Sequence, residues 1–178
     1  ANGYNISVAF NKKETIYIER FKKIVMELFK RKCEVLDKQE NSLEIQFCWQ
    51  ELSSFLTKHF GKYADGKQIP EWAKYINHNL KKQLLLGYLN SDGCITINKQ
   101  SKAVLEFVSI NLTLLEGFQD ILFSLRLISN IQLLKPEKER LLINKIRKTK
   151  PCYTLRMSFH DTVKFYNFFP DYLDHKLN

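Results

Sequence analysis

The chain has 178 residues, of which 44% are hydrophobic and 13% aromatic, and its formal net charge is +9. This composition excludes a disordered chain, because enough apolar side chains are present to form a core. No run approaches the roughly 20 consecutive apolar residues of a membrane span, and the N-terminus lacks the pattern of a signal peptide. The positive charge favours a polyanionic partner, nucleic acid before any other.

The first half of the chain predicts one strand, one helix, two strands and a second helix. Alternating apolar residues indicate a strand over residues 4–10, and helical spacing indicates an amphipathic helix over residues 13–32. Short strands are expected near residues 34–37 and 43–49. A helix over residues 51–60 is expected to end at Gly61. The side chains expected to face inward in the first strand and the first helix are Ile6, Val8, Phe10, Ile18, Phe21, Ile24, Val25 and Leu28.

The second half repeats this order after a linker at residues 62–79 and an apolar helix that ends near residue 92. Strands are expected around residues 94–97, 103–107, 130–134 and 153–159, and a helix over residues 160–169 follows the last strand. A helix between the second and third strands is expected to face inward with Leu115, Phe118, Ile121, Leu122 and Leu125. The pairs Phe10/Phe107, Phe21/Phe118, Ile24/Ile121 and Leu28/Leu125 are 97 residues apart, and Leu43/Tyr153, Ile45/Leu155, Trp49/Phe159 and Phe55/Phe165 are 110 apart. Two constant offsets, separated by one insertion within residues 135–150, indicate an internal repeat.

The fold class predicted from this repeat is a mixed α/β (α+β) protein with two pseudo-symmetric halves. The first half covers residues 1–61 and the second residues 80–178. The four cysteines, Cys33, Cys48, Cys94 and Cys152, show no Cys-x-x-Cys spacing. They predict buried, reduced thiols rather than a disulfide framework or a zinc site. This usage suits an intracellular protein, cytoplasmic, nuclear or organellar, that is not secreted.

The segment 85–93, Leu-Leu-Gly-Tyr-Leu-Asn-Ser-Asp-Gly, is the most informative part of the sequence. Its leucines have helical spacing, and Gly93 is expected to provide the permissive conformation that ends a helix. Asp92 would then lie at the helix end, where a carboxylate can bind a metal. Gly87 and Ser91 share a face with almost no side chain, so a second backbone could approach there. A leucine-rich core helix capped by Asp-Gly is the alternative reading.

This segment resembles the LAGLIDADG motif of homing endonucleases, most closely those of inteins. Residues 66–72, Gly-Lys-Gln-Ile-Pro-Glu-Trp, are similar to the segment that precedes the second motif in such proteins. The resemblance implies two αββαββα units that form a DNA-binding saddle, in a monomer with internal pseudo-twofold symmetry. The equivalent of Asp92 in the first unit would fall just before Ala1. We therefore expect the first unit to lack its initial helix and strand, which another segment or chain would provide.

The resemblance also implies the catalytic groups. Asp92, with the backbone of Gly93, would bind Mg²⁺, and Gly87 and Ser91 would form the helix–helix interface. Lys67 and Lys176 would polarise the attacking water or contact the phosphate, although both also read as ordinary loop lysines. Asn90 replaces the second acidic residue of the motif, a departure that does not remove the principal ligand.

DNA contacts are expected from the polar strand faces and from the basic insertion at residues 135–150, which is expected to form a long hairpin. Short polar and guanidinium side chains can read base edges, whereas lysines follow the phosphate backbone. A solvated sheet face and a solvated charged loop are the alternatives. The expected contact residues are Thr96, Asn98, Lys135, Lys138, Arg140, Lys145, Arg147, Lys148, Thr154, Arg156 and Ser158.

The predicted function is site-specific, Mg²⁺-dependent cleavage of double-stranded DNA, with an intein or a mobile intron as the host. Two alternatives stay open: a related RNA maturase, for which RNA is the partner, and a nucleic-acid-binding domain without nuclease activity. No membrane partner is expected.

Overall fold

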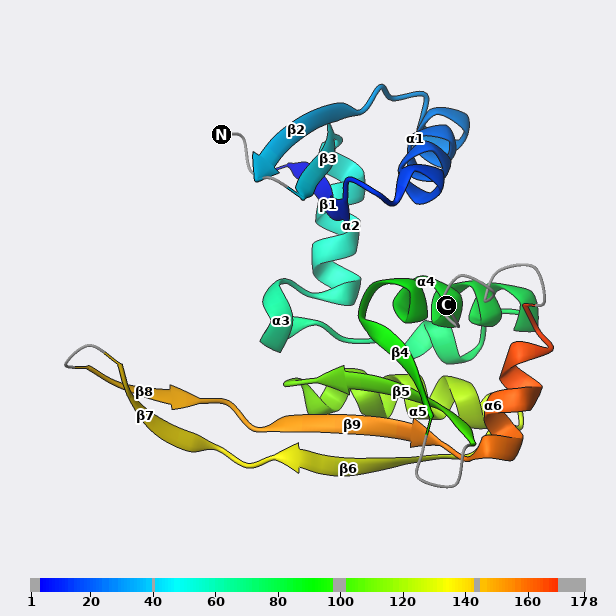
Figure 1. The fold of residues 1–178 in the computed structure, drawn as a ribbon. Helices are drawn as coiled ribbons and strands as arrows, with labels where there is room; N and C mark the ends of the chain where they lie inside the picture. The colour runs from blue at the N-terminus through cyan, green and yellow to red at the C-terminus, as the bar shows by residue number, and fades with distance from the viewer. Residues whose placement is uncertain (1–3, 40, 98–101, 143–144, 170–178) are drawn as a thin grey trace. The chain divides into compact units, whose positions relative to one another are not determined.

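The computed structural model describes residues 4–39, 41–97, 102–142 and 145–169. The chain divides into two compact units, residues 1–58 and 59–178, with the boundary inside α2 (Gln50–Phe60). Each unit has its own antiparallel sheet (Figure 1). No helix in the described part of the chain is both long and apolar enough to span a bilayer.

The first unit consists of β1 (Asn5–Asn11), α1 (Thr15–Phe29), β2 (Glu34–Gln39), β3 (Ser42–Cys48) and α2, and its strands are ordered β1-β3-β2. Burial alternates along β1, as the sequence predicts, with Ile6, Val8 and Phe10 on the less exposed face. The core of this unit includes Ile45 and Phe47 of β3. Gly61 ends α2 with a left-handed φ of 78°, which confirms the predicted helix end.

The second unit contains the longer set of elements. They are α3 (Tyr63–Gly66), η1 (Glu71–Lys74), α4 (His78–Asp92), β4 (Gly93–Ile97), β5 (Ala103–Ser109), α5 (Leu112–Ser124), β6 (Ser129–Lys135), β7 (Lys138–Leu142), β8 (Lys145–Thr149), β9 (Cys152–Met157) and α6 (Phe159–Tyr166). The main sheet is ordered β4-β5-β9-β6. Antiparallel β7 and β8 continue the β6–β9 pair beyond this sheet (Figure 1), so the expected hairpin in the insertion is confirmed.

The core of the second unit lies between one face of its sheet and the helices α4, α5 and α6. Leu105 and Phe107 of β5 and Leu155 of β9 are fully buried there, together with Leu85 and Leu89 of α4. All five inward residues predicted for α5, Leu115, Phe118, Ile121, Leu122 and Leu125, are also buried. Alternation along the strands leaves the opposite face of the sheet for polar side chains.

The strand order confirms the internal repeat, since β5-β9-β6 repeats β1-β3-β2. One predicted correspondence is only half right. Phe10 and Phe107 each pack against a phenylalanine ring on the helix of their own unit. The ring centroids are 5.8 Å apart for Phe10 and Phe21, and 6.0 Å apart for Phe107 and Phe118. In the ladder, however, Phe107 pairs with Leu155, whereas Ile45 pairs with Val8 and not with Phe10. The two-residue slip keeps every side chain on its predicted face.

Two residues of α1 that were predicted to face inward are exposed. Ile24 is 40% and Leu28 68% exposed, whereas their counterparts Ile121 and Leu125 are 0% and 8% exposed. In the second unit α4 contacts α5 through the Tyr88–Phe118 stack, whose ring centroids are 4.2 Å apart. Within the described part of the first unit no helix corresponds to α4, so this apolar stripe stays uncovered.

Residues 62–79, predicted as a linker, pack into the second unit instead. They carry α3 and η1, and Ala73 is fully buried in the core. Ile69 lies so close to Gly117 that a Cβ on the glycine would be 2.6 Å from the Ile69 Cβ. The four cysteines are free, as predicted, but they are half-buried or exposed rather than buried.

Candidate functional site

Asp92 is the last residue of α4, and its side chain is exposed. The carboxyl end of a helix carries a partial negative charge, which opposes an acidic side chain. The last turn of α4 contains no basic residue that would offset this charge. A carboxylate that breaks a local rule of helix stability in this way creates a negative potential suited to a cation.

Gly93 ends α4, but not for the predicted reason. Its φ of −87° and ψ of 156° lie in the extended region that any residue adopts. A Cβ at this position would lie 2.7 Å from the Cα and 2.6 Å from the Cδ1 of Leu89. Glycine is therefore required for space, because β4 begins immediately where α4 ends.

Gly87 and Ser91 lie on an exposed part of α4. Apart from the neighbouring residues and backbone of α4 itself, no described atom lies within 4 Å of a Cβ built on Gly87. The Ser91 hydroxyl turns back to donate to the Tyr88 carbonyl oxygen at 3.0 Å. This part of the helix therefore presents a nearly flat surface that another helix could approach closely.

Tyr88 connects the helix end to the core of the unit. Its ring stacks on Phe118, with the centroids 4.2 Å apart, and is tilted against Phe107 at 5.3 Å. Burial raises the pKa of the Tyr88 phenol to about 12, the negative charge of Asp92 adds to this rise, and a hydrogen bond with Ser109 opposes it. The phenol therefore lies within electrostatic range of Asp92.

We expect the Tyr88 pKa to fall in the variant Asp92→Asn, because removal of the neighbouring charge favours the phenolate. Ultraviolet titration of each protein, minus that of its Tyr88→Phe counterpart, isolates this phenol. In the wild type, stability should fall as the pH rises from 10 to about 12, since only the unfolded state loses the proton there. An unchanged Tyr88 pKa in Asp92→Asn would contradict the geometry.

Lys67 follows α3, and its side chain is exposed. The side-chain amide of Asn111 donates to the carbonyl oxygens of Lys67 at 2.6 Å and of Asp65 at 2.9 Å. The Asp65 carboxylate also pairs with the ammonium of Lys150, and this hydrogen bond holds the pKa of Asp65 below its usual value. The segment that bears Lys67 is thus anchored at its backbone. Lys176, its predicted counterpart, lies outside the described residues.

Tyr88, Ser109 and Asn111 contribute to this site but were not predicted from the sequence. The one available signal was an asparagine directly before an apolar helical stripe, which is typical of a helix N-cap. Asn111 does cap α5, where its Oδ1 accepts from the Leu114 N–H at 3.1 Å. Its two bonds to residues more than 40 positions away follow only from the fold.

The residues present are compatible with a divalent metal but do not enclose one. Within the described ranges, no three His, Cys, Asp or Glu side chains come together as a metal site. Asp92 offers a hard oxygen ligand at the surface. Mg²⁺ commonly binds one or two carboxylates and keeps water or substrate phosphate as its other ligands. Asp92 therefore fits the role of one protein ligand in a site completed by other groups.

The sheet face opposite the core carries the polar side chains predicted to contact DNA. Arg156 of β9 is 41% exposed in its side chain and pairs with Glu106 at 2.8 Å. Thr96 of β4 is half-buried, and its hydroxyl lies 3.5 Å from the Val104 carbonyl oxygen. Thr154 is 6% exposed, and its hydroxyl has no partner among the described residues, which disfavours direct contact. Asn98 lies outside the described residues.

Ser158 was expected on a strand but caps α6. Its hydroxyl oxygen accepts from the Asp161 N–H at 3.1 Å, and the hydroxyl donates to the Asp161 carboxylate at 2.7 Å. Although burial raises the pKa of Asp161, hydrogen bonds from Ser158 and from the backbone of Ile128 bring it below its usual value. The Ser158 hydroxyl is therefore occupied within the protein.

The basic insertion forms the end of β6 and the β7–β8 hairpin. Lys135, Lys138 and Lys148 are exposed. Arg140 pairs with Arg147 across the ladder, and Lys145 begins β8 opposite Leu142. The Lys138 backbone is fixed by the Thr149 hydroxyl, which accepts at 3.2 Å and donates at 3.0 Å. The hairpin thus places several basic residues beyond the ends of β6 and β9.

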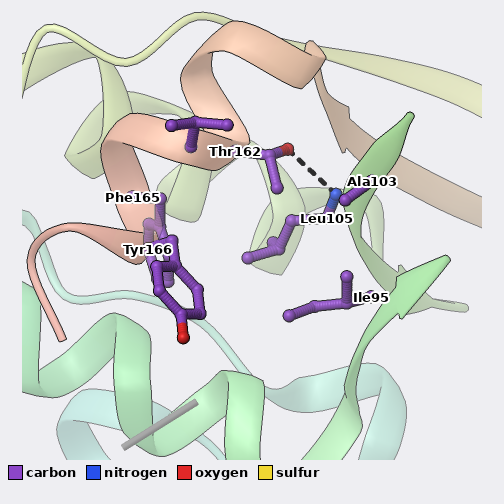
Figure 2. A pocket seen from close by; sticks show the side chains of 7 residues that line it. Ile95, Ala103, Leu105, Thr162, Phe165 and Tyr166 are labelled. Atoms are coloured by element: carbon purple, nitrogen blue, oxygen red, sulfur yellow. Dashed lines mark hydrogen bonds between the residues drawn. The ribbon is translucent and has the colours of Figure 1, made fainter. Parts of the chain in front are cut away.

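A separate apolar cavity of about 230 Å³ lies between β4, β5 and α6 (Figure 2). Within it, the Thr162 hydroxyl accepts the Leu105 N–H at 3.1 Å. The cavity contains none of the predicted site residues, and its lining is apolar apart from the hydroxyl groups of Thr162 and Tyr166. Its lining residues are Ile95, Ala103, Leu105, Thr162, Val163, Phe165 and Tyr166.

Solved structures similar to this chain include several of the homing endonuclease I-DmoI. Mesophilic variants of I-DmoI match with 18% identity and a TM-score of 0.62, over 93% of this chain and 74% of theirs. The I-DmoI complex with DNA and Mn matches with 17% identity and a TM-score of 0.61, over 92% and 79%. The I-DmoI complex with DNA and Ca matches with 18% identity and a TM-score of 0.62, over 93% of this chain and 74% of that one. At these identities the likeness shows a shared fold.

The N-terminal LAGLIDADG domain of WhiA is also similar, with 16% identity and a TM-score of 0.51 over 91% of this chain and 70% of that one. Among curated protein sequences, no match to the chain was found. The family profile described as the LAGLIDADG-like domain matches residues 79–167, half of the chain. This range runs from α4 through α6 and includes Asp92. The chain therefore belongs to the LAGLIDADG family.

Proposed function

We propose that this protein is a site-specific endonuclease that cleaves double-stranded DNA with Mg²⁺. The observation that carries this proposal is the exposed carboxylate of Asp92 at the carboxyl end of α4, beside the flat surface at Gly87 and Ser91. The similarity to I-DmoI, whose structures include complexes with DNA and Mn or Ca, supports a DNA partner and a divalent ion. By the resemblance of residues 66–72 and 85–93 to the motifs of homing endonucleases, an intein or a mobile intron is the proposed host.

Each part of the second unit has a distinct task in this proposal. Asp92 holds the metal, which when bound stabilises the charge that develops on the reacting phosphate. Lys67 contacts the phosphate or orients the attacking water. The polar sheet face with Arg156 contacts bases, and the β7–β8 hairpin contacts the DNA backbone, where charge sets affinity rather than sequence preference.

A second carboxylate beside Asp92 would complete the protein ligands of a divalent metal. We infer that it comes from another helix that packs on α4 at Gly87 and Ser91, from a segment or chain outside the described residues.

The two glycines of the motif should respond oppositely to alanine. Gly93→Ala should destabilise the second unit by about 1–3 kcal/mol, because its Cβ meets the Leu89 backbone. Gly87→Ala should stabilise it by about 0.5–1 kcal/mol, because an open helical position gains a better helix former. Urea unfolding measures both. If the helix pairing is correct, the more stable Gly87→Ala protein nevertheless cleaves more slowly, and an undiminished rate would contradict the pairing.

The main test begins with selection of a binding site from random duplex DNA by the full-length protein. A plasmid that carries the selected site is then incubated with Mg²⁺ or with EDTA. The proposal predicts a double-strand break at the selected site in the sample with Mg²⁺ and no break in the sample with EDTA. Tight duplex binding without cleavage would show a binding domain, and a strong preference for structured RNA would show a maturase.

One observation favours the runner-up, a nucleic-acid-binding domain without nuclease activity. In the described part of the chain, Asp92 has no companion acidic residues grouped with it for metal binding. Binding through the sheet face and the hairpin does not require such a group. The plasmid experiment separates these readings directly, since the two proteins would bind the same DNA and only one would cut it.

A further inference from the structure

One buried side chain from another element donates two hydrogen bonds to the backbone of the segment that bears Lys67. The Asn111 amide donates one hydrogen bond to the Lys67 carbonyl oxygen at 2.6 Å and another to the Asp65 carbonyl oxygen at 2.9 Å. Asn111 is only 8% exposed. Its amide nitrogen therefore has both of its protons committed within the protein.

Helix capping alone does not explain why an amide occupies this position. The capping contact of Asn111 uses Oδ1, which accepts from the Leu114 N–H at 3.1 Å. Aspartate or serine would cap as well, but neither could donate to the two carbonyl oxygens. Asn77 caps α4 with the same kind of contact, to the Leu80 N–H at 2.9 Å. The two N–H donors of the Asn111 amide therefore serve a purpose that helix capping does not require.

The same short segment also contacts the helix that carries Asp92. The Asn111 N–H donates to the Ser109 hydroxyl oxygen at 3.0 Å, and Ser109 is hydrogen bonded to Tyr88. Tyr88 lies one helical turn before Asp92 on α4 and is fixed by its stack on Phe118. Residues 109–111 therefore connect the segment of Lys67 with the end of α4.

We propose that Asn111 is a positioning residue that holds the Lys67 backbone in register with the Asp92 end of α4. This inference rests on the proposed endonuclease function. A fixed backbone limits the positions that the Lys67 ammonium can reach. Less conformational entropy is therefore lost when this side chain meets the DNA. The substrate is the scissile phosphate of duplex DNA, whose negative charge the ammonium would meet.

The test is the variant Asn111→Asp, which keeps the capping oxygen and replaces the donors by an oxygen. The matched control is Asn77→Asp, the same change at a residue that only caps. We expect Asn111→Asp to lower the single-turnover cleavage rate roughly 10- to 100-fold, with the DNA dissociation constant within about twofold of the wild type. Asn77→Asp should cleave like the wild type. Asn111→Ser, which removes the donors without adding charge, should repeat the loss.

Two further measurements distinguish positioning from general damage. In a Lys67→Ala background, the Asn111→Asp change should cause little additional loss, because both changes remove the same contribution. The Gln68 N–H, which donates to the Phe60 carbonyl oxygen at 2.9 Å, should exchange faster with solvent in Asn111→Asp.

The proposal would be overturned if Asn111→Asp cleaved at the rate of Asn77→Asp. It would also be overturned if the rate loss of the double variant equalled the product of the losses caused by Asn111→Asp and Lys67→Ala separately. If the wild type does not cleave, the endonuclease function itself fails. In that case, faster Gln68 exchange still supports Asn111 as the tether of this segment, and unchanged exchange rejects it.

Discussion

Replacement of Asp92 by asparagine is expected to lower the rate of DNA cleavage on the order of 10³-fold or more, while the protein stays folded and still binds DNA. The side chain is exposed at the helix end, so its neutral isostere costs no packing. Removal of a negative charge from the carboxyl end of α4 should even stabilise the helix slightly. The measurement is single-turnover cleavage of the selected site, with DNA affinity measured in Ca²⁺.

The control for this prediction is Glu116→Gln, which neutralises another exposed carboxylate, on α5. That variant should cleave like the wild type. Undiminished cleavage by Asp92→Asn would remove Asp92 from the site, and equal losses in both variants would point to net charge as the cause.

Replacement of Phe107 by alanine is expected to destabilise the second unit by about 3–5 kcal/mol, because it removes a large, fully buried ring. The ring contacts both Tyr88 at 5.3 Å and Phe118 at 6.0 Å, so the cavity would lie directly beneath the site. Urea unfolding measures the loss. A Trp49→Phe background leaves Trp72 as the fluorescent reporter, and Trp72 belongs to the second unit.

Phe123→Ala provides the matched control, because this ring on α5 is 75% exposed. Its free energy of unfolding should stay within about 0.5 kcal/mol of the wild type. A similar loss in both variants would mean that Phe107 is not the centre of the core.

The sequence predicted the elements whose pattern is local. The apolar stripe of α5 and the end of α4 at Asp92 follow from residue spacing within a single helix, and all are found as expected. The repeat also followed, since apolar positions recur when two units bury the same faces. Gly61 was predicted correctly because a left-handed residue after a helix is a local requirement.

What depends on neighbours far along the chain was not predicted. Ile24 is exposed although its spacing matches that of buried Ile121, since burial depends on whether a helix like α4 covers it. The ladder slip at Phe10 leaves the alternation unchanged and so has no signature in the sequence. Gly93 was assigned a conformational role, whereas its requirement for space arises only from contact with Leu89.

The candidate site shows the same division. Asp92 was predicted from a motif, because a helix end and its carboxylate are adjacent in sequence. The tether from Asn111 to Lys67 spans 44 positions and could be found only in the fold. The sequence predicted a linker at residues 62–79, yet Ile69 and Ala73 pack into the core.

The central claim is that Asp92 is a metal ligand of a DNA-cleaving site, and iron can locate that metal directly. Fe²⁺ replaces Mg²⁺ at oxygen-ligand sites, and with ascorbate and peroxide it generates radicals that cut nearby polypeptide and DNA. In the complex of the full-length protein with its selected DNA, we predict polypeptide cuts beside residue 92 that disappear in Asp92→Asn. Cuts that occur only elsewhere, or that persist unchanged in Asp92→Asn, would contradict the assignment.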